Sequence, residues 1–399
     1  MFEVVLAVLL ATTAGLLTVP IFTLLFEVLS AIRGYPDQLD GVPNATNSEI
    51  TAVVIPAHNE GASLVPTLSD LRPQLGSNDR LIVVADNCSD DTAAIARGEG
   101  AEVIERTDPA HLGKAYALAA GIAYLNQAPP DLVMFVDADC RVKPDTLPRL
   151  KRACVKSKRP VQACVLMVAP KRCSIDHRLA EFFWRLRNLV RPLGLARLGL
   201  PAQLMGTGMI FPWRLIRGAT LRHGNLVEDL QLGLDLAEIG CAPLFYPCVV
   251  GTSEFPHTKA GTESQRQRWI QGHVRMIVRD LPRRFARAVQ EHNWDLLVLI
   301  LDVAVPPFSM LASIAMVMLI AAVALFLLVG IASPMVVAGI NFGALLGAVL
   351  LAWTKFGREL ISIRDLAAIW RSLLNRLSFY ARVYFGSRAS SWVRTDRSD

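Results

Sequence analysis

Three kinds of pattern are missing from this chain of 399 residues, and each absence disfavours a class of site. No basic stretch is interleaved with aromatic residues, so the net charge of +6 points to phosphorylated small molecules or an anionic membrane surface rather than nucleic acid. None of the seven cysteines forms a C-x-x-C pair, which disfavours a zinc site, and their odd number fits a reducing cytoplasm. No G-x-G-x-x-G follows the first predicted strand, which disfavours a dinucleotide site.

Charge is also missing from long apolar blocks near both ends of the chain, and the mean hydropathy is positive. Val4 to Phe26 is uncharged and long enough to span a bilayer, and its Met-Phe-Glu start differs from the basic start of a secretory signal. Phe308–Gly330 and Met335–Trp353 predict two further spans. Trp294–Val305 is shorter and contains Asp302, which favours an interfacial helix.

The distribution of arginine predicts the orientation of these spans. The loop 331–334 has no Lys or Arg, whereas 31–290 and the tail after Lys355 are rich in arginine, so both should lie on the cytoplasmic side. Residues 174–200 mix aromatics with arginines and fit either a core helix or a helix at the membrane surface. One apolar helical stripe in the tail predicts an interfacial helix; it comprises Leu366, Trp370, Leu373, Leu377, Tyr380 and Tyr384.

Strands alternate with helices between residues 51 and 139, which predicts a parallel sheet. The strands are short apolar runs bounded by polar residues. The predicted strands are 51–56, 81–85, 101–105 and 132–136. One predicted helix ends near Leu71, a second starts near Thr92, and a third spans Lys114–Asn126.

Two carboxylates, Asp137 and Asp139, follow the fourth predicted strand. Residues i and i+2 of an extended chain point the same way, so both can face one ligand at the carboxyl end of the strand. Like charges at this spacing need a compensating cation or hydrogen bonds. Oxygen ligands of this kind suit Mg²⁺ or Mn²⁺ bound with a diphosphate. The alternative is an acidic turn without a ligand.

Three later segments are also candidates for a site. Gly206-Thr207-Gly208 predicts a turn that lets a substrate approach the backbone. Glu228 and Asp229 precede a helical pattern, and they fit either an N-terminal cap or a base held in a cleft. Gln265 to Trp269 also has a helical pattern, for which the alternative is a solvated basic face with one buried tryptophan.

Taken together, the motifs resemble family 2 glycosyltransferases with the GT-A fold, over roughly residues 50–275 and the flanking helices. Ala85 stands where many relatives have Asp, Val227 stands where synthases often have Thr, and three crossings are fewer than in cellulose synthases. The segment Gln265 to Trp269 is similar to the Q-x-x-R-W signature of cellulose, chitin and hyaluronan synthases. The five blocks, in the family's order, are Pro56-Ala-His-Asn-Glu60, Asp86 in Val-Val-Ala-Asp-Asn, Asp137-Ala-Asp139, Glu228-Asp229 and Gln265-Arg-Gln-Arg268-Trp269.

The resemblance implies an α/β chain in which a Rossmann-like, mostly parallel GT-A sheet forms a cytoplasmic domain. About three transmembrane helices and several interfacial helices accompany that domain. The expected organisation is an N-terminal transmembrane helix in 1–30, the glycosyltransferase domain in 31–285, and a C-terminal membrane region in 286–399.

The resemblance also implies an activity at the inner membrane: inverting transfer from a nucleotide-diphosphate sugar, most simply a UDP-sugar, to a glycan or lipid-linked acceptor in polysaccharide synthesis. Export or assembly proteins are further expected partners, with membrane lipids and no nucleic acid. The alternatives are single addition to a lipid acceptor, or a non-catalytic subunit of an assembly complex. The implied donor-binding residues are Pro56, Glu60, Asp86, Lys114, Asp137, Gln265 and Arg268; Asp137 and Asp139 would bind Mg²⁺ or Mn²⁺, Asp229 (with Glu228 next) would be the base, and Gly206, Thr207 and Trp269 would contact the acceptor.

Overall fold

The computed structural model describes residues 2–34, 48–170, 174–219, 221, 227–255 and 259–365. Within these ranges the side chains of residues 2, 248–250, 259–266 and 268 are outside the description. The apolar stripe predicted for the tail begins at Leu366 and therefore lies outside the described residues.

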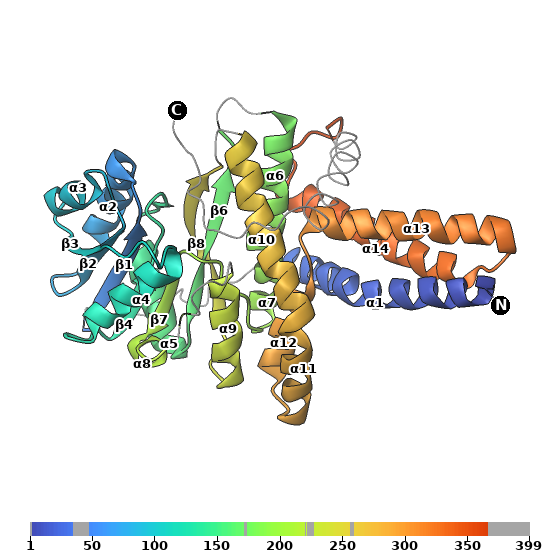
Figure 1. Ribbon diagram of the computed structural model, residues 1–399, viewed down its shortest axis with the longest axis horizontal. Coiled ribbons are helices and arrows are strands. Elements are labelled where there is room, and N and C mark those ends of the chain that lie inside the picture. The colour runs from blue at the N-terminus through green and yellow to red at the C-terminus, as the bar shows by residue number, and fades with distance from the viewer. Residues whose placement is uncertain are drawn as a thin grey trace.

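The described residues form an eight-stranded mixed sheet in the order β3-β2-β1-β4-β7-β6-β8-β5 (Figure 1). Its first four strands are parallel, as the alternation of strands and helices predicts. Beyond them β7 is antiparallel to both neighbours, and β5 is antiparallel to β8 at the edge. The strands are β1 (Thr51–Ala57), β2 (Arg80–Asp86), β3 (Glu102–Arg106), β4 (Leu132–Phe135), β5 (Arg141–Val142), β6 (Val161–Val168), β7 (Met209–Pro212) and β8 (Leu244–Glu254).

The central parallel strands β1, β2 and β4 are apolar on both faces because helices cover both. In β1, Val53 and Ile55 face a core shared with α2 and α5, while Ala52 and Val54 face a core shared with α4. This packing leaves the carboxyl ends of β1, β2 and β4 as the edge at which loops can build a site. The helices and short turns of this part are η1 (Gly61–Leu64), α2 (Val65–Leu71), η2 (Arg72–Gln74), α3 (Thr92–Gly98), α4 (Lys114–Leu125), α5 (Thr146–Ser157) and α8 (Trp213–Ile216).

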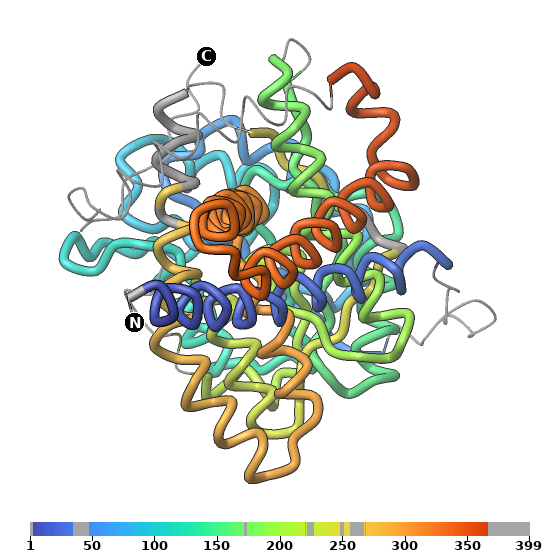
Figure 2. The backbone as a smooth tube through the Cα atoms, turned by 90° about the vertical axis from the view of Figure 1, so that its right-hand side faces the viewer, coloured from blue at the N-terminus to red at the C-terminus, as the bar shows by residue number. Residues whose placement is uncertain are grey.

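Three helices are long and apolar enough to cross a membrane: α1 (Phe2–Ala31), α13 (Phe308–Val329) and α14 (Ser333–Phe356). They confirm the three predicted spans. They extend together away from the sheet, and α1 packs along α14 (Figures 1 and 2). Their orientation across the membrane stays a prediction.

Between the sheet and these helices stand α6 (Ile175–Arg185) and α10 (Lys259–Arg279) (Figure 1). α6 continues through the π-helical turn η3 (Leu186–Val190) into α7 (Arg191–Arg197). Leu179 and Phe182 of α6 are buried in a core shared with α1 and α14. Residues 174–200 thus form packed helices at the end of the domain that faces the membrane helices.

The helices α9 (Glu228–Glu238), α11 (Leu281–Gln290) and α12 (Trp294–Ala304) pack together around a separate apolar core. The helix predicted over 294–305 is therefore present as α12. Its packing against α9 and α11 explains its buried leucines. Contact of α12 with a membrane surface stays a prediction.

A buried charge network links the first membrane helix to the domain. Arg191 of α7 donates to Oε2 of Glu27 in α1 at 2.6 Å and to Oδ1 of Asp302 in α12 at 2.6 Å. All three side chains are almost fully buried. Gln203 donates to both carboxylate oxygens of Asp302, at 3.3 and 3.2 Å. The charge within α12 is thus neutralised inside the protein rather than exposed to lipid.

Candidate functional site

The loop that ends in β7 brings several predicted site residues together. The ammonium of Lys114 donates hydrogen bonds to Oδ1 of Asp137 and to the carbonyl oxygen of Gly206, the latter at 2.7 Å. The backbone N–H of Asp137 donates to Oγ1 of Thr207 at 2.9 Å. A Cβ built on Gly206 would lie 3.4 Å from Oδ2 of Asp229 and 3.6 Å from Nζ of Lys114. Residues far apart in sequence therefore meet at one point beside the carboxyl end of β4.

Two features fix the shape of that loop. Gly206 and Gly208 have φ values of +85° and +66°, which L side chains rarely adopt. Gln162 of β6, fully buried, accepts from the N–H of Met205 at 2.7 Å and donates to the carbonyl of Thr207 at 2.8 Å. Sequence analysis missed Gln162, although a lone glutamine inside an apolar strand is an available signal.

The two aspartates after β4 lie in a turn rather than in extended chain. β4 ends at Phe135, one residue before the predicted end, and the N–H of Cys140 bonds to the carbonyl of Asp137 at 3.2 Å. The side chain of Asp137 meets Lys114, whereas Oδ2 of Asp139 accepts from Oγ of Ser253 in β8 at 2.7 Å. The extended-chain argument for the pair therefore does not hold, but both carboxylates do follow the carboxyl end of the strand.

The donor set after β4 fits a hard divalent cation. Among the described residues, no three His, Cys, Asp or Glu side chains are grouped closely enough to hold a metal by themselves. Mg²⁺ bound with a diphosphate needs only one or two carboxylates, because phosphate oxygens and waters complete its coordination. Asp137 and Asp139 can supply those carboxylates, and Lys114 compensates the charge of Asp137.

Glu228 and Asp229 occupy the first turn of α9, and Val227 is its N-cap. Oδ1 of Asp229 accepts from the N–H of Leu230 at 2.8 Å. Burial, and then the charge of Asp229, raises the pKa of Glu228 to about 7; burial also raises the pKa of Asp229. Burial alone would lower the pKa of Lys114, but Asp137 and these two acids raise it instead. A carboxyl group whose pKa lies near neutrality is suited to accept a proton.

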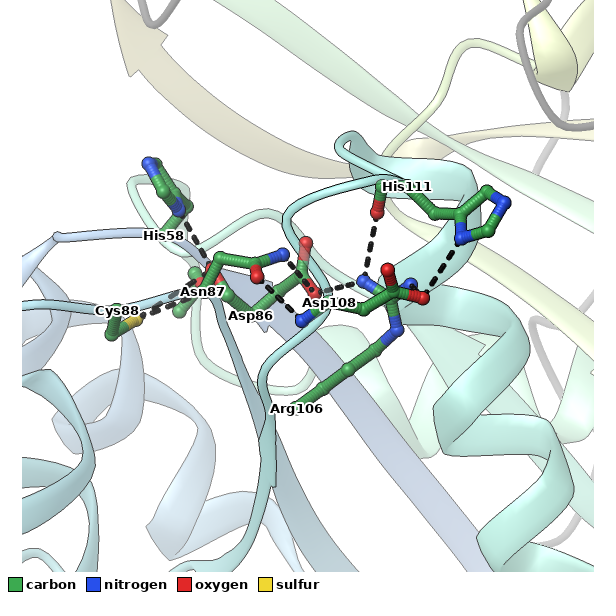
Figure 3. Close-up of polar contacts among 8 residues, drawn as sticks. His58, Asp86, Asn87, Cys88, Arg106, Asp108 and His111 are labelled. Atoms are coloured by element: carbon green, nitrogen blue, oxygen red, sulfur yellow. Dashed lines mark hydrogen bonds and ion pairs between the residues drawn. The ribbon is translucent and has the colours of Figure 1, made fainter.

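A second polar group joins the loops after β2 and β3 (Figure 3). Arg106 donates to Oδ1 of Asp86 at 2.5 Å and to Oδ2 of Asp108 at 2.9 Å. Asn87 accepts from the N–H of Asp108 at 2.7 Å and donates to Oδ1 of Asp86 at 3.1 Å. Both bonds to the Asp86 side chain use Oδ1, so Oδ2 accepts none from the described residues. Arg106 and Asp108 were missed, although charged residues at a strand end are a usable signal.

The loop after β1 meets the same region. His58 Nδ1 lies 2.7 Å from the carbonyl oxygen of Asp86, and the N–H of Glu60 donates to Oγ1 of Thr92 at 2.9 Å (Figure 3 shows His58). Pro56 lies within β1 itself, next to this loop. The side chain of Glu60 accepts from Ser63 at 3.0 Å. The predicted nucleotide-binding residues Pro56, Glu60 and Asp86 thus belong to adjoining strand ends.

The Gln265–Trp269 block lies in α10, as its helical pattern predicts. The side chains of Gln265 and Arg268 are outside the described residues. Trp269 is half-buried, and its ring centroid lies 4.9 Å from that of Trp184. Both rings line a cavity of about 130 Å³. Trp269 is therefore part of a cavity wall and not only of an apolar core.

Comparison with known proteins shows a family and several similar proteins. Residues 48–272, more than half of the chain, match the family model described as "Glycosyltransferase like family 2". An undecaprenyl-phosphate 4-deoxy-4-formamido-L-arabinose transferase from Aeromonas hydrophila is 32% identical over 120 residues, which are 28% of this chain and 36% of that protein. A mannosyltransferase from Pyrobaculum calidifontis, solved with GDP-Man and Mn²⁺, superposes with a TM-score of 0.53 at 18% identity, over 87% of this chain and 98% of the other. This chain therefore spans about a third of the curated relative, and the structural likeness concerns the fold.

Proposed function

Because this chain belongs to glycosyltransferase family 2 and has the GT-A fold that its motifs predict, we propose that it is a membrane-bound inverting transferase using a nucleotide-diphosphate sugar. The observation that supports this most is the convergence of Lys114, Asp137, Gly206 and Asp229 at the carboxyl end of β4. That point adjoins the strand ends that carry the polar loops. A cation, two acids and a close backbone approach at this edge of the sheet support a donor site there.

For the donor we propose a UDP-sugar, held at its base by Asp86. Uracil presents one N–H at N3, and Oδ2 of Asp86 is an acceptor with no other hydrogen bond from the described residues. Arg106 orients this carboxylate through its other oxygen. Pro56 and Glu60 would line the same nucleoside pocket from β1 and its loop.

The leaving diphosphate gathers negative charge as the bond to the sugar breaks, so cations must stabilise it. Lys114 is one such cation, and the motif assigns Arg268 as a second; Gln265, from the same motif, would bind the donor through its neutral amide. Asp137 and Asp139 would hold Mg²⁺ or Mn²⁺, which supplies charge neutralisation to the leaving group when bound.

The acceptor hydroxyl has a high pKa, so a carboxylate must take its proton as the new bond forms. We assign this role to Asp229, whose Oδ2 lies nearest the Gly206 backbone, with Glu228 as the alternative. Attack from the face opposite the leaving group inverts the anomeric centre. Gly206 and Thr207 would border the acceptor, and Trp269 would present an apolar ring to it.

The acceptor we propose is a glycan or lipid-linked sugar used in polysaccharide synthesis at the inner membrane, with the catalytic domain cytoplasmic. The three candidate membrane helices support a membrane-borne acceptor, and a relative over part of its length carries a lipid phosphate in its name. Export or assembly proteins would then be its partners. A reporter fused after Asp399 should be active only in a cytoplasmic-type assay; periplasmic-type activity would contradict this orientation.

A second candidate function is the addition of a single sugar to a lipid acceptor, which the apolar cavity beside Trp269 favours. A non-catalytic subunit is disfavoured because Lys114 is hydrogen-bonded to Asp137, and Asp229 borders the same Gly206 loop. Membranes incubated with a panel of radiolabelled nucleotide sugars should label a product, and the length of that product separates processive from single addition. Absence of labelling with every nucleotide sugar would contradict the proposal.

A further inference from the structure

A cavity of about 130 Å³ lies where the membrane helices meet the domain. Its walls come from α1, from α6 and η3, from α10, and from the link between α12 and α13. An apolar cavity of roughly 150 Å³ holds a benzene-sized molecule, so this one has room for one short segment of a hydrocarbon chain. Its apolar walls include Leu24, Phe183, Trp269, Ile270, Val305 and Phe308.

The position of these walls connects the cavity to the bilayer. Leu24 belongs to the candidate span α1, and Phe308 is the first residue of the candidate span α13. In Figure 1, α10 and α6 flank the point where α1 and α13 reach the domain. A molecule anchored in the membrane by an apolar chain can therefore reach the cavity without crossing the domain.

One cation at the cavity, Arg187, is not ion-paired with any of the described residues. The guanidinium of Arg187 makes no hydrogen bond or ion pair with the described residues and lies 5.8 Å from the ring centroid of Trp184. Its neighbour Arg191, also on the wall, is neutralised by Glu27 and Asp302. Burial lowers the pKa of Arg187, and the charge of Asp229 opposes that shift. An arginine side chain stays charged in proteins, so the guanidinium remains a cation.

The wall carries two further polar groups. Nε1 of Trp184 is buried and has no hydrogen-bond partner among the described residues, so it is an unused donor. Burial, reinforced by the charge of Arg187, lowers the pKa of His273 to about 3, so its ring is neutral. Nε2 of His273 donates to the carbonyl of Val303 at 2.7 Å. The wall therefore combines a cation and an unpaired N–H with apolar rings, which suits an anionic group attached to a hydrocarbon chain.

We propose that this cavity binds the lipid phosphate of a lipid-linked acceptor, with Arg187 and Trp184 Nε1 donating to phosphate oxygens and the first part of the chain against Phe308 and Ile270. The proposal rests on the proposed transferase function and deepens it. The acceptor sugar would then extend from the cavity toward the Gly206 loop, where the proposed base Asp229 lies. A polar glycan chain is the poorer occupant, since most of the wall offers it no hydrogen bonds.

The test is calorimetric titration of the full-length protein in detergent with farnesyl phosphate, in the absence of any sugar donor. The wild type should bind it, and Arg187→Gln should bind it about tenfold more weakly, because a charge-assisted hydrogen bond is lost. Trp184→Phe keeps an aromatic ring but removes the N–H together with the five-membered part of the indole, and it should also weaken binding. Farnesol, which lacks the phosphate, should bind the wild type and Arg187→Gln alike.

Arg178→Gln is the matched control, because Arg178 lies on α6 outside the cavity and faces Asp365 at 3.9 Å. It should change the affinity for farnesyl phosphate less than about twofold. Equal binding by wild type and Arg187→Gln, or displacement of farnesyl phosphate by similar concentrations of inorganic phosphate, would overturn the proposal. The titration contains no sugar donor, so it tests the lipid site alone. If the protein binds farnesyl phosphate but transfers no sugar in a separate assay, the result contradicts the proposed function and not the lipid site.

Discussion

Arg106 holds one oxygen of Asp86 at 2.5 Å and leaves the other oxygen of the same carboxylate without a hydrogen bond from the described residues (Figure 3). The pair is almost buried at the carboxyl ends of β2 and β3. A carboxylate oxygen oriented in this way can accept a hydrogen bond from a single N–H on a flat base. The donor assignment therefore depends on Asp86 more than on any other side chain.

Asp86→Asn should weaken UDP binding by tenfold or more, because hydrogen bonds to charged groups contribute about 1.5–3 kcal/mol. UDP methylated at N3 lacks the relevant N–H and should bind wild type and variant equally. Arg97→Gln is the control, since it removes only an exposed ion pair with Glu105. If N3-methyl-UDP binds the wild type as tightly as UDP does, the assigned contact is wrong.

Asp139→Ala should abolish sugar transfer and should remove the Mn²⁺ dependence of UDP binding. The reason is that a carboxylate beside the diphosphate position is lost, and EDTA should act on the wild type in the same way. Ser253→Ala removes only the 2.7 Å hydrogen bond to Asp139 and should retain most activity. Full transfer in EDTA would contradict a metal role for this site.

Arg191→Met should destabilise the protein by about 3–5 kcal/mol, because Glu27 and Asp302 would be left as uncompensated buried charges. Arg197→Met, which removes only exposed hydrogen bonds to carbonyls, should cost about 1 kcal/mol or less. Neutralising all three charges together should recover part of the loss. Equal denaturation midpoints for the two single variants would contradict this account of the network.

The pH dependence of transfer should follow the acid pair of α9. Because burial and Asp229 raise the pKa of Glu228 to about 7, the pair carries an extra proton below that pH and its full negative charge above it. Transfer by a base in this pair should therefore fall as the pH drops below about 7. Repulsion between the carboxylates is mutual, so Glu228→Gln should shift this limb to lower pH. An unchanged pH profile in Glu228→Gln would contradict the electrostatic coupling of Glu228 and Asp229.

The fold was predictable because its signals are local. Apolar length gives the three spans, and alternation of short apolar runs with helical segments gives β1 to β4 and their parallel order. The order of the acidic motifs indicates the protein family, and the resemblance to that family assigns Lys114, Asp137 and Asp229 to one predicted site. Their contact around Gly206 agrees with that placement.

Other parts of the site were not predictable because they depend on contacts between distant segments. The pairing of Arg106 with Asp86 joins two strand ends, and Gln162 supports a loop more than 40 residues away in sequence. The turn after β4 replaced the extended geometry assumed for Asp137 and Asp139, since Lys114 and Ser253 draw the two carboxylates to different partners. The sequence of 174–200 showed arginines among aromatics but did not distinguish Arg187, because only the folded protein shows that it makes no ion pair with the described residues.

The most direct test of the account compares donor binding with sugar transfer in Asp229→Asn. The variant keeps the size and shape of the side chain but cannot take the acceptor's proton, so transfer should fall by at least about a hundredfold while UDP binding stays near wild type. Trp269→Ala should instead weaken acceptor use more than donor binding. If Trp269 only packed in the core, the substitution would cost roughly 3–5 kcal/mol of stability and would lower acceptor use and donor binding together. If Asp229 were only a helix cap, asparagine would serve nearly as well. Near-normal transfer by Asp229→Asn would therefore contradict its role as the base and leave Glu228 as the next candidate.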